Sequence, residues 1–188
     1  ISAAQDLKSN YDQSLGEATK VMVVGDSFSS DFINMMKVND ALQGIDLIKP
    51  KYNCFNDTDI DENAKLAMLQ SDFIVVAYRF LDLKSQLSCL KNKIDYLIYY
   101  KKQIVIIGTK DFGYNINAPL RQKLYSFRAQ PSAKIKNFNK YLDTIAPANN
   151  FVDILSLLED ENGRIPLFTE GRKLISYDRA HLTYNGAK

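Results

Sequence analysis

Residues 21–31, Val-Met-Val-Val-Gly-Asp-Ser-Phe-Ser-Ser-Asp, constrain the fold more than any other stretch of the chain. Residues 21–24 are apolar and mostly β-branched, which predicts a buried strand. The strand pattern stops at Gly25, and glycine suits a sharp turn because it has no Cβ to clash with nearby backbone. A helical spacing of apolar residues follows over residues 28–42. Ser27 is therefore predicted at a strand end and a helix start, where backbone N–H groups without helical partners can stabilise an oxyanion.

The rest of the chain alternates short apolar runs with helical patterns. Further strands are predicted over residues 45–48, 73–78, 103–108 and 151–154, and helices over residues 62–69, 81–102 and 133–145. This alternation predicts an α/β fold, a three-layer doubly wound parallel sheet. Ligands of such sheets gather at the carboxyl ends of the strands, which is where Ser27 is placed.

One long segment, residues 109–132, is predicted to be irregular because it contains glycine and two prolines and shows no clear period. It carries four aromatic residues, Phe112, Tyr114, Tyr125 and Phe127. Long loops in compact domains are often functional. These aromatic side chains are expected either to wall a cleft and stack on sugar rings, or to pack into the core of the domain.

Length and patterning predict one domain over residues 19–188, because 188 residues with 46% apolar content can bury a full core. Residues 1–18 are polar and weakly patterned, which favours a linker or N-terminal extension. The first residue is Ile1, and residues 186–188 lie in what is expected to be the opening of a final helix. We expect the chain to be part of a longer protein; a processed secreted enzyme is the alternative.

The charge balance argues against nucleic acid as a partner, since 24 basic residues face 22 acidic ones and no basic block with interleaved aromatics occurs. The longest apolar runs, such as residues 73–78, are far shorter than the roughly 20 residues needed to span a bilayer. No glycine-rich loop follows a strand, so no phosphate cradle is predicted.

No metal site is expected either, because the chain has one histidine and two cysteines with no zinc-binding spacing. The acidic loop with Asp57, Asp59 and Asp61 lacks the glycine and the terminal glutamate of a calcium loop. Cys54 follows the second predicted strand, and Cys89 lies in the predicted helix after the third. These belong to neighbouring layers of the expected fold, so the two cysteines are expected either to form a disulfide or to be free thiols.

The far end of the chain supplies the partners that a nucleophilic serine needs. Asp178 and His181 are three residues apart, and His181 is the only histidine in the chain. That spacing lets the carboxylate accept a hydrogen bond from one ring nitrogen while the other faces Ser27. The pattern predicts an acyl-transfer triad of Ser27, His181 and Asp178. The alternative is that the Gly-Asp-Ser segment only caps a helix and that the histidine has no catalytic role.

These two blocks resemble the first and last sequence blocks of the SGNH hydrolases, also called the GDSL family. The segment Asp178-Arg179-Ala180-His181-Leu182-Thr183 with Gly186-Ala187 is most similar to the C-terminal SGNH domains fused to membrane acyltransferases of family 3. The middle of the chain agrees in outline, with residues 74–80 ending in an Ala-Tyr-Arg-Phe step and with the segments Ile106-Ile107-Gly108 and Phe112-Gly113.

The resemblance implies a flavodoxin-like SGNH hydrolase fold and transfer of an O-acyl group, expected to be acetyl, to a bacterial cell-surface polysaccharide through a serine acyl-enzyme. It implies a glycan acceptor, an acyl donor and a membrane acyltransferase domain in the same chain, and no cofactor. It also implies a position on the periplasmic or extracellular face, tethered to the inner membrane. A stand-alone carbohydrate esterase or lipase-like hydrolase is the alternative, and a non-catalytic glycan-binding module is a second one.

The chain departs from the family at the oxyanion hole. The family adds a glycine and an asparagine from its second and third blocks, but Tyr78-Arg79-Phe80 stands where the third block is expected. Arg79 is a candidate substitute donor, or else a partner in a structural ion pair. Asp26 and Tyr78 are further candidates for contact with the oxyanion or the substrate.

Overall fold

A computed structural model of the chain describes residues 18–49, 62–79, 90–91, 94–95, 97–113, 117–147 and 149–188. The predicted N-terminal extension, except for its last residue, lies outside these ranges. So do Cys54, Cys89 and the three aspartates of the acidic loop. The predictions made for those residues stay predictions.

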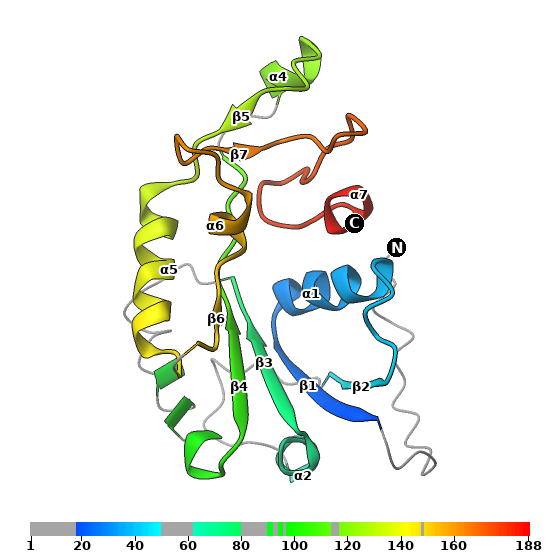
Figure 1. Ribbon diagram of the computed structural model, residues 1–188, viewed down its shortest axis with the longest axis vertical. Coiled ribbons are helices and arrows are strands. Elements are labelled where there is room, and N and C mark those ends of the chain that lie inside the picture. The colour runs from blue at the N-terminus through cyan, green and yellow to red at the C-terminus, as the bar shows by residue number, and fades with distance from the viewer. Residues whose placement is uncertain are drawn as a thin grey trace.

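The centre of the molecule is a parallel sheet, which confirms the predicted α/β class (Figure 1). Its strands are β1 (Thr19–Gly25), β2 (Ile45–Ile48), β3 (Phe73–Ala77), β4 (Gln103–Ile107) and β6 (Phe151–Val152), in the order β2-β1-β3-β4-β6. From β1 the chain first adds β2 on one side and then returns to add β3 on the other. The order therefore reverses between β1 and β3, and this switch point is where doubly wound sheets bind ligands.

Two apolar layers cover the two faces of the sheet, because neighbouring strand residues point to opposite sides. Met22, Ile74 and Ile106 pack with residues of α2 (Glu62–Gln70) and α5 (Ala133–Ile145), and with the helical residues Leu90, Ile94 and Leu97. Val23, Val75 and Ile107 pack on the other face with residues of α1 (Ser27–Val38) and with Ile154 of α6 (Ile154–Leu158). These layers make the predicted three-layer arrangement.

A smaller antiparallel sheet lies beyond the carboxyl ends of the main strands (Figure 1). It pairs β5 (Arg128–Ala129) with β7 (Ile165–Pro166), and α4 (Asn117–Arg121) precedes it in the chain. The segment 109–132 therefore contains a helix and a strand, which corrects the expectation of an irregular loop. The reason is local pairing, since β5 gains its partner from a segment more than 30 residues away in sequence.

The aromatic residues of that segment divide between core and surface. Phe112 is 1% exposed in a second apolar core, and the ring of Tyr125 packs edge-on against Phe168 at 5.3 Å between centroids. Phe127 is 42% exposed, and Tyr114 lies outside the described residues. Packing in the core is thus the outcome for Phe112 and Tyr125.

Several helix and strand ends differ from the predicted ones. Helix α1 begins at Ser27 rather than residue 28, because Asp26 caps it, and it ends at Val38, before Asp40 with its positive φ of 52°. The last main strand is only Phe151–Val152, because Asp153 accepts the Leu155 N–H and starts α6. A final short helix, α7 (Tyr184–Ala187), is capped by Thr183.

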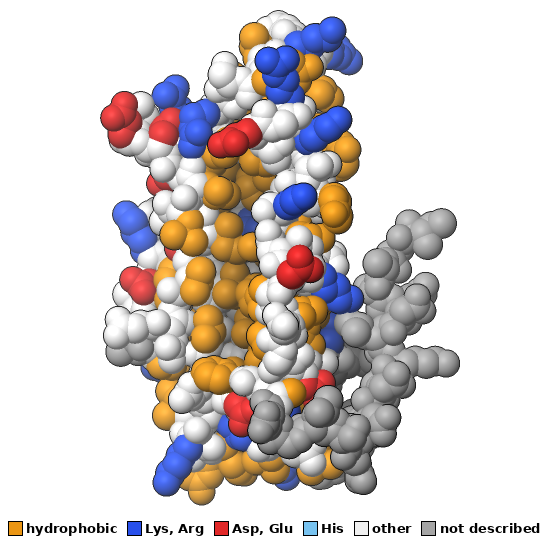
Figure 2. Space-filling model, turned by 45° about the vertical axis from the view of Figure 1, so that its right-hand side comes forward, with side chains coloured by type: hydrophobic (Ala, Val, Ile, Leu, Met, Phe, Trp, Pro, Cys, Tyr) orange, Lys and Arg blue, Asp and Glu red, His pale blue; other side chains and the backbone are white. Residues whose placement is uncertain are grey.

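Figure 2 shows a vertical band of hydrophobic side chains along the middle of one face, flanked by charged side chains. Exposed hydrophobic residues of the described chain include Leu157 at 76% and Val152 at 37%. None of the helices in the described ranges has the length and apolarity that crossing a bilayer requires.

Candidate active site

The turn that presents Ser27 is built by close contact between β1 and β3. Gly25 pairs with Ala77, and a Cβ at Gly25 would lie only 1.8 Å from the Ala77 carbonyl oxygen. Only a hydrogen atom fits in that space, so the sequence requires glycine at this position. The chain then turns sharply from the end of β1 into the first turn of α1.

The Asp26 carboxylate holds the start of α1 through hydrogen bonds to two different segments of the chain. Its Oδ1 accepts the Phe28 N–H at 2.9 Å, which is an N-cap contact. The Arg79 N–H donates to both carboxylate oxygens, at 3.2 Å and 3.0 Å. The carboxylate therefore ties the first turn of α1 to the chain that leaves β3.

Ser27 and His181 meet although 154 residues separate them in the sequence. The Ser27 Oγ lies 2.6 Å from the His181 Nε2, and the His181 Nδ1 contacts the Asp178 Oδ2. The His181 side chain is 34% exposed and that of Asp178 is 53% exposed. The structure thus brings the three predicted residues together in the order hydroxyl, imidazole, carboxylate, at a surface that substrate can reach.

A tight turn holds Asp178 and His181 in this arrangement. The Asp178 Oδ1 accepts the backbone N–H groups of Ala180 at 3.0 Å and of His181 at 2.8 Å. Arg179, which follows Asp178 in this turn, has a positive φ of 73°, and its carbonyl accepts the Phe112 N–H at 2.8 Å. The loop after β4 therefore supports the turn that carries the imidazole.

The pKa of the Asp178 carboxyl is lowered well below its ordinary range. Partial burial alone would raise this pKa, but the hydrogen bonds from the His181 ring and from the backbone N–H groups of His181 and Ala180 outweigh it. The carboxylate is therefore charged at neutral pH. A charged Asp178 can hold one tautomer of the ring and stabilise an imidazolium.

The arrangement has the parts for nucleophilic attack on an ester. His181 can take the proton of the Ser27 hydroxyl, and Asp178 can orient the ring. The Ser27 N–H lies at the first position of α1, and no group in the described ranges accepts it. This N–H is available as one donor to an oxyanion.

The remaining predicted residues occupy different positions. Arg79 is exposed directly after β3, where its backbone N–H contacts Asp26. The half-buried carboxylate of Asp26 caps α1, and its contact with substrate stays a prediction. The Tyr78 side chain is 2% exposed in the core with Ile74 and Val76, so the structure does not place it in contact with substrate.

A buried ion pair beside the triad residues was not predicted from the sequence. The Lys110 Nζ lies 2.9 Å from the Asp31 Oδ2, with the two side chains 3% and 9% exposed. Burial lowers the pKa of Lys110, and the charge of Asp31 opposes that shift. The available signal was the spacing of Asp31, which lies four residues after Ser27 and so on the same face of the helix.

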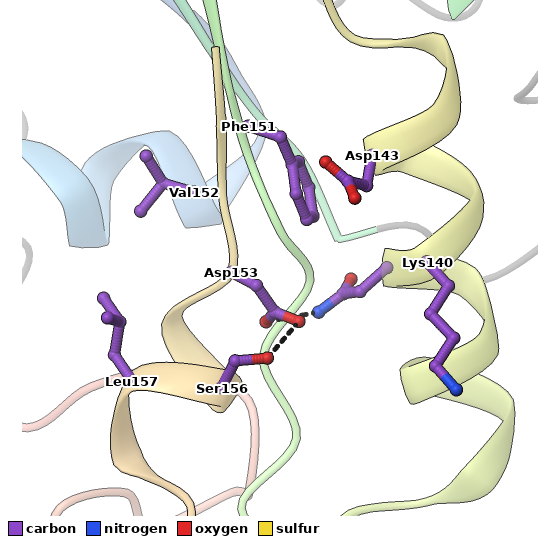
Figure 3. A pocket seen from close by; sticks show the side chains of 8 residues that line it. Lys140, Asp143, Phe151, Val152, Asp153, Ser156 and Leu157 are labelled. Carbon is purple, nitrogen blue, oxygen red and sulfur yellow. Dashed lines mark hydrogen bonds between the residues drawn. The ribbon is translucent and has the colours of Figure 1, made fainter. Parts of the chain in front are cut away.

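A separate pocket of about 500 Å³ lies between α5 and the β6–α6 turn (Figure 3). Figure 3 shows Phe151 pointing toward α5, next to Asp143. Asp153 organises its polar side by accepting from the Asn139 Nδ2 at 2.8 Å and the Ser156 Oγ at 2.9 Å. None of the three triad residues lines this pocket.

Within the described ranges, no three His, Cys, Asp or Glu side chains are grouped so as to hold a metal ion.

Comparisons with known proteins support the fold. No protein-family model matches the chain, and no curated protein matches it. The chain is similar in structure to an acetyl xylan esterase, with a TM-score of 0.52, 13% identity, and coverage of 89% of this chain and 93% of that one. The N-terminal part of a Bacteroides fragilis protein containing a phosphatase domain matches at a TM-score of 0.42 and 12% identity, covering 90% of this chain and 48% of that chain. The likeness to the esterase extends over nearly the whole of both chains, and it is a likeness of fold.

Proposed function

We propose that this chain breaks or transfers O-acyl esters of carbohydrates through a serine acyl-enzyme. The observation that carries the proposal is the 2.6 Å contact between the Ser27 Oγ and the His181 Nε2, with Asp178 on the other ring nitrogen. The similarity in fold to an acetyl xylan esterase supports an acetyl ester of a glycan as the substrate class.

The proposed reaction has two halves. In the first, the Ser27 Oγ attacks the ester carbonyl while its proton passes to His181, and that proton then leaves with the sugar or donor hydroxyl. In the second, His181 takes a proton from an acceptor hydroxyl, whose oxygen attacks the acyl carbon. The bond from that carbon to the Ser27 Oγ breaks, and His181 returns the proton to Ser27. Water as acceptor gives hydrolysis, and a sugar hydroxyl gives acyl transfer.

The finer form of the proposal is acetyl transfer to a bacterial cell-surface polysaccharide, as the soluble part of a larger membrane acyltransferase. It is supported by the resemblance of residues 178–187 to that group and by the shortage of identified oxyanion donors. The Ser27 N–H is one donor, and the exposed Arg79 is the candidate for a second. Since loss of one donor typically costs about 2.7–4 kcal/mol of transition-state stabilisation, we expect slow hydrolysis of small esters by the chain alone.

The proposal is tested with a chromogenic acetyl ester and with acetylated xylan. Ser27→Ala and His181→Ala should each remove nearly all activity, and the double variant should lose little more, because residues that act as a unit are not additive. Ser156→Ala removes a hydroxyl that hydrogen-bonds to Asp153 and to none of the three triad residues, and it should retain activity. A serine-directed phosphonate should add one label to the wild type and none to Ser27→Ala. Full activity in Ser27→Ala would refute the assignment.

Transfer and hydrolysis are separated by the acceptor. The chain alone and the chain joined to a membrane acyltransferase half are expressed in cells that lack the native gene, and O-acetyl groups on the surface polysaccharide are measured. We expect acetylation only from the joined form. In the same cells, we expect a protease added on the periplasmic side to cleave the domain. Acetylation by the chain alone, or rapid cleavage of simple esters, would favour the stand-alone esterase.

A further inference from the structure

The buried Asp31–Lys110 pair lies where three segments of the chain meet. Asp31 belongs to α1, one turn after Ser27. Lys110 follows β4, and its ammonium lies 2.9 Å from the Asp31 Oδ2. The same Oδ2 accepts the Leu182 N–H at 3.1 Å. One carboxylate oxygen thus joins the nucleophile helix, the loop after β4 and the residue that follows His181.

The aromatic ring of Phe28 forms a second connection between Lys110 and the imidazole. The Lys110 Nζ lies 3.9 Å from the centroid of the Phe28 ring, which is within cation–π range. The edge-on contact between Phe28 and His181 has a centroid distance of 5.7 Å and an interplanar angle of 88°. Lys110 therefore touches the residue next to the nucleophile on one side and, through Asp31, the chain next to the base on the other.

We propose that the Asp31–Lys110 pair is a positioning device that holds the His181 ring against Ser27. The inference rests on the proposed role of His181 as the base. Ser27 and Asp31 lie on one face of α1 and both contact the C-terminal loop, through the His181 ring and the Leu182 N–H. Lys110 keeps the Asp31 carboxylate aimed at Leu182, because a buried ion pair with these hydrogen bonds has one favourable geometry.

Removing the pair without leaving a buried charge separates positioning from stability. Lys110→Met alone leaves Asp31 buried and unpaired, which is expected to destabilise the fold. The double variant Asp31→Leu/Lys110→Met fills similar volume with apolar groups, so its unfolding midpoint should return toward the wild type. Its Leu182 N–H still lacks the carboxylate acceptor. We expect kcat to fall about 10- to 100-fold in this double variant, with KM within about twofold, because small misplacements of a reacting group cost about that much.

The matched control is Lys136→Met. Lys136 also forms an ion pair, at 2.7 Å with Glu159, but these side chains are 26% and 22% exposed, and both belong to the part of the fold around α5 and α6. Its removal should leave kcat and KM unchanged.

A second readout does not depend on activity. His181 is the only histidine, so its imidazole carbon-bound protons give an unambiguous NMR signal. These signals should shift and broaden in the double variant and stay in place in Lys136→Met. Wild-type kcat together with unmoved imidazole signals in the double variant would overturn the positioning role. The outcome could also be a wild type that is inactive on acetyl esters together with imidazole signals that differ between the wild type and the double variant. That result would overturn the proposed function and leave the positioning role intact.

Discussion

Replacing Asp26 by alanine should destabilise the fold by more than the loss of one helix cap. The variant removes the N-cap acceptor of Phe28 N–H and also the link to the Arg79 N–H. An N-cap replaced by alanine typically costs about 1 kcal/mol. The second hydrogen bond is to a charged group, and because the Arg79 N–H is shared between both oxygens we take the lower end of its range, about 1.5 kcal/mol. The sum is about 2.5 kcal/mol, which for a chain of this length lowers the Tm by about 5–10 °C.

The chain offers a matched control in Ser132, the N-cap of α5. Its Oγ accepts the Ile135 N–H at 3.2 Å and makes no second link of the kind that Asp26 makes to Arg79 in the described structure. Ser132→Ala should therefore cost only about 1 kcal/mol. Asp26→Asn keeps one oxygen for the Phe28 N–H, so its loss should fall between those of the two alanine variants.

The assay is urea unfolding followed by far-UV circular dichroism, with unchanged m-values as the check that ΔG can be compared. Ester hydrolysis is measured on the same samples below the transition. Equal losses in Asp26→Ala and Ser132→Ala would refute the contribution of the Arg79 link. Unchanged stability with activity lost would mean that Asp26 acts on the substrate and not on the helix.

Two further predictions concern the turn and the imidazole partner. Gly25→Ala should destabilise the fold by about 1–3 kcal/mol or more, because the new Cβ would clash with the Ala77 carbonyl oxygen. The control is Gly171→Ala, whose Cβ would lie 3.7 Å from a Thr169 side-chain atom and should be tolerated. Equal Tm values for the two variants would contradict this prediction. The pKa of Asp178 is lower in the folded state than its ordinary value of 3.8, so the charged carboxylate stabilises the folded state at pH values above 3.8. This contribution is lost as the pH falls from there toward the pKa of the folded state. The stability gap between wild type and Asp178→Asn should therefore be constant near neutral pH and shrink below about pH 4 in urea titrations, and a gap that grows in acid would contradict the sign.

The main sheet was predictable because its strands are covered on both faces. Such strands are continuous apolar runs, as in residues 73–77 and 104–107, and they differ clearly from the helical patterns between them. β6 was predicted at the right place but two residues too long, because its pattern does not show where α6 begins. β5 and β7 were not predicted. They have two residues each, too few for any period to appear, and they pair with each other across a long separation in sequence.

The site was only partly accessible to sequence reasoning. Ser27, Asp178 and His181 could be picked out because each is a chemically distinctive residue at a turn. Tyr78 was misplaced because the alternation of β3 continues past its last paired residue, so Tyr78 shares the core face of Ile74 and Val76. Lys110 could not be identified, since a lysine after a strand usually faces solvent and its partner is 79 residues away.

The two sides of the Ser27–His181 contact are supported by different parts of the fold. Ser27 is placed by the contact of β1 with β3, through Gly25 against Ala77 and Asp26 against the Arg79 N–H. The turn that carries His181 is contacted by the loop after β4, where the Phe112 N–H donates to the Arg179 carbonyl and Lys110 pairs with Asp31, which accepts the Leu182 N–H. These supports come from the carboxyl ends of β1, β3 and β4, which are neighbours in the sheet. The supports of the Ser27–His181 contact therefore include the sheet as well as the short Asp178–His181 turn.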